Sequence, residues 1–148
     1  MNINAKPSEI VALLQSHSPQ SQAASTVNTN CIDVSKFHTI MAVIQTGVLG
    51  ASATVDFSLQ QATDTSATGV KNIPGKALTQ IVKASGDDKQ AIINLRVSDL
   101  DVEGGFDCVR MKIIVGTAAS LVSAQLYGIG PRMAPASDSN PASVVQVV

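Results

Sequence analysis

The stretch TVDFSLQ, residues 54–60, decides the fold class of this chain. Its three apolar residues, Val55, Phe57 and Leu59, alternate with polar ones, and successive side chains of an extended strand point to opposite faces. The stretch therefore predicts a strand that buries one face. The polar residues between and after the three apolar ones are expected to face water.

The same alternation returns along most of the chain, between polar breaks that contain glycine. In the stretch 106–115, for example, Val109, Met111, Ile113 and Val115 are expected to face inward. Strands are expected at residues 26–33, 37–46, 54–60, 77–83, 91–97, 106–115 and 121–129, with a further candidate at 6–14. About eight short strands at such spacing predict an all-β protein, a single jelly-roll-like β-sandwich, although up-and-down barrels also use eight strands.

The N-terminal region is less regular. Residues 6–14, KPSEIVALL, fit either a short buried strand, which we favour, or the first turns of a helix that opens at Pro7 and Ser8. Residues 15–25 are rich in Ser, Gln and Ala and are expected to form a surface loop. The break at residues 47–51 indicates a hairpin between the strands that flank it.

The length of 148 residues and the 45% apolar content predict one domain with a real core. This sandwich domain is expected over residues 1–131, and a Pro-rich extended tail over residues 132–148. The tail ends in VVQVV, which is expected to pair with an edge strand of its own copy or of a neighbour. A frayed terminus is the alternative.

The stretch 37–46, FHTIMAVIQT, is apolar on both faces in its middle. Such a pattern predicts a central strand that is covered on both sides or that faces a partner subunit. We therefore expect self-association through the segment from Ile40 to Ile44.

The charge pattern argues against several classes of partner. Ten Lys and Arg against eleven Asp and Glu give a net charge of -1, and the basic residues are scattered, which disfavours nucleic-acid binding. Aromatic residues are only 3% of the chain, too few for the stacking platforms of single-strand binders. No apolar run approaches the roughly 20 residues that span a bilayer, and no hydrophobic signal core opens the chain, so we expect a soluble protein without a membrane partner.

One acidic stretch has the beginning of a calcium loop. Asp99, Asp101 and Glu103 alternate along DLDVEG, and Gly104 lies at the expected bend. The position that should supply a bidentate Glu is Arg110. The sequence therefore favours a strand end with an acidic outer face, and no metal ligand is assigned.

No catalytic or cofactor motif is present in the sequence. The imidazoles are His17 and His38, and no G-x-S-x-G elbow presents a serine to either of them. The segment Gly128-Ile129-Gly130 lacks the third Gly and the Lys of a phosphate-binding loop. Tyr127 is the sole tyrosine, which leaves little for a sugar to stack on. We assign no catalytic residue and no cofactor, and do not expect an enzyme.

The two cysteines, Cys31 and Cys108, are too few for a disulfide framework and lack the spacing of a zinc or redox pair. Two buried thiols are favoured, because free Cys packs as a small apolar residue. The alternative is a long-range disulfide that joins two strands.

Four segments, about two-thirds of the chain, together resemble the small head decoration, or cement, proteins of tailed bacteriophages. They are CIDVSKFHTIMAVIQTG (31–47), TVDFSLQQATD (54–64), VSDLDVEGGFDCVRMKIIVGTA (97–118) and LYGIGPRMAP (126–135). The resemblance implies a structural subunit on the exterior of the capsid, assembled in the host cytoplasm. It also implies that the subunit, often a trimer, binds the major capsid protein and bridges neighbouring capsid subunits.

Two alternatives to this role remain open. Another small virion protein, such as a head-tail connector, a tail protein or a spike base, could use the same sandwich. A non-viral ligand-binding jelly roll is the alternative from a different class.

Overall fold

The alternating stretches form strands in the computed structural model, which describes residues 4–148. The strands are β1 (Val11–Gln22), β2 (Ser25–Asn28), β3 (Ile32–Asp33), β4 (Phe37–Thr46), β5 (Thr54–Ala62), β6 (Lys71–Ala77), β7 (Ile81–Val82), β8 (Gln90–Arg96), β9 (Cys108–Gly116) and β10 (Ser120–Pro131). The short helices are α1 (Pro7–Ile10), α2 (Lys83–Gly86) and the 3₁₀ helices η1 (Val97–Asp99) and η2 (Ala136–Ser139).

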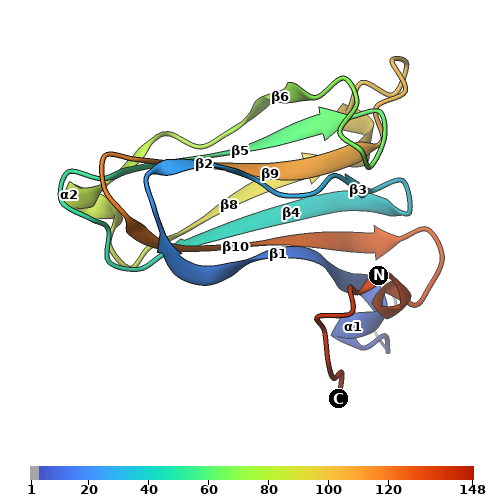
Figure 1. Cartoon of the computed structure of the whole chain (residues 1–148). Coiled ribbons are helices and arrows are strands. Elements are labelled where there is room, and N and C mark those ends of the chain that lie inside the picture. Colours follow the sequence, from blue (N-terminus) through green and yellow to red (C-terminus); the bar gives the residue numbers. More distant parts are fainter. Residues whose placement is uncertain (1–3) are drawn as a thin grey trace.

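Two antiparallel sheets face each other as a sandwich (Figure 1). One sheet has the order β1-β10-β4-β8, and the other has the order β2-β9-β5-β6, with β3 also paired to β9 and β7 also paired to β5. Because β2 and β3 share one partner and β6 and β7 share another, each pair acts as one interrupted strand. The sandwich therefore has the eight strand positions that the sequence predicts.

The strand pairs are nested along the chain. The first strand pairs with the last, β2 and β3 pair with β9, β4 pairs with β8, and β5 pairs with β6 and β7. This nested order arises when a long antiparallel ribbon folds over and wraps around a core. Such an arrangement is the jelly roll. The prediction of an all-β, jelly-roll-like sandwich is confirmed.

The core lies between the sheets and is built from the residues that the alternation selects. Val55, Phe57 and Leu59 are fully buried on β5, and the inward residues of β9 are buried beside them in the same sheet. Most other core residues are small and aliphatic, as the shortage of aromatic residues predicts; the exception in size beside Phe57 is Phe37. Gly128 on β10 makes room for the Phe37 ring, because a Cβ at residue 128 would lie 2.7 Å from it.

The surface loop predicted at residues 15–25 is wrong. Strand β1 continues to Gln22 and stays paired with β10 through two register shifts, at Leu13/Gln15 and His17/Gln20. These bulges interrupt the alternation, and both faces of the second half of β1 are polar, so the sequence has no strand signal there. At residues 6–14 each alternative holds for part of the segment: α1 occupies Pro7–Ile10 and β1 follows.

The hairpin predicted across residues 47–51 is also wrong. Strand β4 belongs to the four-stranded sheet and β5 to the other, so the break carries the chain from one sheet to the other. A second difference concerns Gln60, which was expected to face water but is buried. Its Nε2 donates to Asn72 Oδ1 at 2.8 Å, and its Oε1 accepts from Arg110 Nε at 2.9 Å.

The C-terminal segment first packs against the sandwich and then leaves it. Ala136 in η2 is fully buried, and Asn140 Oδ1 accepts a hydrogen bond from the backbone N–H of Leu13 at 3.0 Å. The end of the chain then extends past α1, away from the sheets (Figure 1). Residues 144–148 form no strand with the described part of this chain, so pairing with an edge of their own copy is not found.

Candidate functional site

The outer face of the four-stranded sheet differs from the rest of the surface in charge. The chain has ten basic and eleven acidic residues, and a single one of them, Arg96, lies in a strand of this sheet. Strands β1, β4 and β10 carry no Asp, Glu, Lys or Arg at all. Large uncharged areas of this kind are typical of surfaces that contact other proteins.

Apolar side chains form the middle of this outer face. Register places Tyr127 between Leu13 and Met41, and places Val43 beside Ile92. These side chains are half-buried, except that of Ile92, which is 54% exposed. We call this surface the uncharged face and define it by the outward residues of β4, β8 and β10 and of the first half of β1.

The prediction for β4 is confirmed in part. Ile40, Ala42 and Ile44 are buried in the sandwich core, whereas Met41 and Val43 lie on the uncharged face. The strand is central in its sheet, but nothing in the described part of this chain covers its second side fully. The alternative in which it faces a partner subunit stays a prediction.

The outer face of the six-stranded sheet has the opposite character. Asp56, Arg110 and Lys112 point outward from β5 and β9. Asp56 accepts hydrogen bonds from Gln80, and Arg110 is held by Gln60. This face presents charges in both signs to water, as a solvent-facing sheet surface does.

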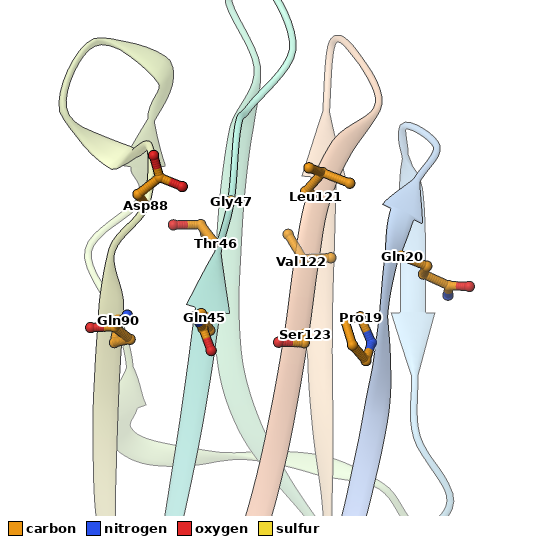
Figure 2. Close-up of a pocket in the computed structure, with 10 residues that line it drawn as sticks. All are labelled: Pro19, Gln20, Gln45, Thr46, Gly47, Asp88, Gln90, Leu121, Val122 and Ser123. Atoms are coloured by element: carbon orange, nitrogen blue, oxygen red, sulfur yellow. The ribbon is translucent and has the colours of Figure 1, made fainter.

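A cleft of about 380 Å³ lies at one end of the uncharged face (Figure 2). Gln90, Gln45 and Ser123 pair across β8, β4 and β10 and form a polar row in it. Leu121 adds an apolar wall, and Asp88 is the one carboxylate among the lining residues. Amides and a hydroxyl can exchange hydrogen bonds with a partner backbone or with a polar ligand.

The acidic stretch that begins like a calcium loop does not converge on an ion site. Asp101 pairs with Lys71 at 2.5 Å and accepts from the backbone N–H of Gly104, and these hydrogen bonds hold the pKa of its carboxyl below the usual value. Asp99 pairs with Lys76 at 3.6 Å, while Glu103 is exposed. The described residues contain no group of three or more His, Cys, Asp or Glu placed to hold a metal.

The two histidines lie far apart on the four-stranded sheet. His17 pairs with Ala124, whereas His38 follows Phe37, which pairs with Pro131. This places the imidazoles roughly 20 Å apart along β10. Burial lowers the pKa of His17, whose ring lies 3.4 Å from Gln20 Nε2.

The glycines of Gly128-Ile129-Gly130 belong to strand β10 and open no helix. The hydroxyl of Tyr127, on the same strand, donates to Gln125 Oε1. Tyr127 therefore helps to build the uncharged face, whereas Gly128 lies against Phe37 in the core. They do not form a phosphate cradle, because such a cradle needs a helix N-terminus.

Cys31 and Cys108 lie together in a small buried cluster with Ala62, and both are free thiols. The prediction of two buried thiols is confirmed. Burial raises the pKa of Cys31, and it raises that of Cys108 to about 12 with help from a hydrogen bond to Asp107. A thiol that stays protonated is a poor nucleophile.

No helix of the described residues is long and apolar enough to cross a membrane.

Comparison with known protein families gives no match, and comparison with curated proteins gives none. Solved structures with a similar arrangement include a protein of the Bacillus endospore appendages, a family of disulfide-linked pili (16% identity, 87% of this chain and 98% of that chain covered, TM-score 0.39). Others are the SPBc2 prophage-derived protein YomS (9% identity, 85% and 98% covered, TM-score 0.43) and a chain of broad bean stain virus (12% identity, 90% and 96% covered, TM-score 0.37). None of these TM-scores reaches 0.5, so the similarities carry no argument about function.

Proposed function

We propose that this chain is a structural subunit of a bacteriophage virion that coats the capsid exterior and bridges neighbouring copies of the major capsid protein. It acts by contact and transforms no substrate. The virion part of the proposal is supported by the segments that resemble head decoration proteins and by the jelly-roll-like sandwich that this resemblance implies.

The uncharged face carries the contact part of the proposal. A side of the molecule whose four strands hold one charged residue, Arg96, loses little hydration energy when another protein covers it. At about 4.8 Å per strand and 3.3 Å per residue, the sheet offers an area of roughly 600 Å². Specific interfaces bury about 800 Å² on each partner, so this face is large enough to supply most of one contact.

Many weak contacts suit a coat protein. A subunit repeated over a shell gains strength from the number of linked contacts, so no single contact needs high affinity. The homotrimer that the resemblance implies also fits such a lattice. In a trimer the two surfaces that meet differ from each other, whereas a twofold dimer uses the same surface twice.

A cosedimentation experiment tests the proposed function. Purified chain is mixed with empty shells assembled from the major capsid protein encoded in the same genome, and bound copies are counted after centrifugation. We expect saturable binding that Ile92→Asp weakens at least about tenfold, since it places a charge in the contact. Thr26→Asp is the matched control, an exposed strand residue on the other sheet. Absence of binding by the unaltered chain, or equal loss in both variants, contradicts the proposal.

One observation favours a second candidate function. The cleft beside Gln45 and Gln90 combines apolar walls with a short polar row, as a site for a small ligand would. A ligand-binding jelly roll would be stabilised by its ligand, so a screen of glycans for a raised melting temperature distinguishes the two functions. A shift that Gln45→Ala and Gln90→Ala abolish would favour the ligand-binding module.

A further inference from the structure

The sheet edges of this sandwich are poor templates for an added strand. On β1, two register shifts and Pro19 disrupt the edge, and Asn140 already occupies the N–H of Leu13. On β8, Lys76 Nζ donates to the carbonyl of Asn94 at 2.8 Å. Bulges, proline and lysine at edges are the usual means by which β proteins prevent strand addition.

The edges of the six-stranded sheet are also poor templates. Strand β2 is four residues long, and β6 contains Pro74 within a register shift against β5. A C-terminal segment that needs cover must therefore find it on a face of a sheet.

The C-terminal segment does need cover. Residues 141–148, PASVVQVV, carry no charged side chain, and Val145 is 94% exposed. Val147 and Val148 are exposed as well. Four valines within five residues form an apolar strip, which a soluble protein rarely leaves open.

The geometry of the tail sets its reach. Asn140 fixes the start of the tail beside β1, at the margin of the uncharged face. The N–H of Val144 donates to the carbonyl of Pro141 at 2.9 Å, so residues 141–144 form a turn in the single chain. Once this turn opens, the eight residues span up to roughly 27 Å, more than the width of four strands at about 4.8 Å each. The tail can thus cross a whole sheet of a neighbour that lies beside it.

We propose that residues Val144–Val148 of one copy pack on the uncharged face of a second copy. Apolar valines then meet Val43, Met41 and Ile92, and none of these side chains loses the hydration of a charge. In the single chain the strip stands away from its own face, which leaves both surfaces open. The contact is head-to-tail, and such a contact builds a ring when its rotation closes, as a trimer requires. This inference deepens the proposed function and rests on it for the trimer. At about 3.3 Å per residue and one strand width of about 4.8 Å, the five-residue strip covers roughly 80 Å² of the face, so most of the face stays open to the capsid.

Mixing two full-length variants tests the inference. The tail variant carries Val145→Asp with Val147→Asp, and the face variant carries Val43→Asp with Ile92→Asp. Each is expected to weaken self-association at least about tenfold in light scattering, because each lacks one of the two surfaces. Thr26→Asp should associate like the unaltered chain. Circular dichroism checks that every variant is folded.

The mixture gives the decisive result. The face variant still has a tail and the tail variant still has a face, so the two should form a complex that contains one copy of each and grows no further. Self-association of the tail variant at the strength of the unaltered chain would overturn the inference, because two faces would then meet directly. A monomeric unaltered chain at high concentration would overturn it too, as would the absence of a mixed complex. The tail variant remains informative even where the face variant is unfolded.

Shell binding separates this inference from the proposed function. If the mixed complex forms but the unaltered chain does not bind shells, the tail contact stands and the capsid role fails. If the tail variant is monomeric, forms no mixed complex and still coats shells, the capsid role stands and the tail contact fails.

Discussion

Cys108 makes the stability of the fold depend on pH. Burial, followed by the hydrogen bond to Asp107, raises the pKa of this thiol from 9.0 to about 12. The folded state therefore holds a proton that the unfolded state releases above pH 9.0. The contribution of this thiol to the free energy of unfolding is fully present below pH 9.0 and is lost as the pH rises toward about 12.

The difference between the unaltered chain and Cys108→Ala isolates this effect. Urea unfolding from about pH 8 to about pH 11 should show a steeper fall in the free energy of unfolding for the unaltered chain. Cys31→Ala serves as the control, because it keeps Cys108. Parallel curves for the unaltered chain and Cys108→Ala would contradict the assignment.

Single residues also show what an alternating pattern can and cannot predict. The pattern assigns Val55 and Phe57 to the buried face because that face meets the other sheet. It places Gln60 on the outer face but contains no information on what covers that face. Asn72 and Arg110 come from other strands, so the burial of Gln60 depends on strand order.

At the scale of elements, the C-terminal segment divides into a packed part and a free part. Removal of residues 132–148 deletes the buried Ala136 and the Asn140 bond, and should lower the free energy of unfolding by about 1–3 kcal/mol. Removal of residues 141–148 alone should change it by less than about 0.5 kcal/mol, because Val145 and its neighbours are exposed. Urea unfolding of both truncated chains is the measurement.

The shorter truncation is also the better probe of binding. Loss of shell binding after removal of residues 132–148 could follow from the weakened fold, whereas loss after removal of residues 141–148 points to the free part. Equal stability of both truncated chains would contradict the division at Asn140.

Lys76 binds a backbone carbonyl of the edge strand β8. Its Nζ donates to the Asn94 carbonyl and lies 3.6 Å from Asp99 Oδ2. Lys76→Ala should leave the fold intact but expose that edge, and we expect faster aggregation on heating, followed by light scattering. Lys71→Ala is the matched control, since Lys71 pairs with Asp101 in a loop. Equal aggregation rates for the two variants would contradict the protective role.

Strand positions could be predicted from the sequence where one face is buried, and not where both faces are wet. Strand β9 and the first six residues of β5 alternate because each strand packs one face on the core. The second half of β1 is polar throughout and bulged, so its sequence reads as a loop. The link from β4 to β5 is short, like a hairpin turn, and only the sheet order shows that it changes sheets.

For the whole molecule, the separation of charge becomes visible only after the strands are assigned to sheets. Along the sequence the charged residues are scattered, and no cluster of basic residues forms a stripe. The nested pairing brings β1, β4, β8 and β10 together, and these four strands hold one charged residue in total, Arg96, whereas the strands of the other sheet hold six. The segment from Ile40 to Ile44, where self-association was expected, therefore includes two residues of the uncharged face, Met41 and Val43. The other strands of that face could not be identified from the sequence.

The same separation of charge predicts how assembly responds to salt. Screening weakens contacts between exposed charges, whereas burial of apolar surface does not depend on screening. The tail carries no charged side chain and the uncharged face carries one, that of Arg96. The dissociation constant for self-association should therefore change less than about threefold between about 50 mM and about 500 mM sodium chloride. Sedimentation equilibrium at the two salt concentrations measures it. Weakening by more than about tenfold would mean that copies meet through the charged six-stranded sheet, where Asp56, Arg110 and Lys112 lie.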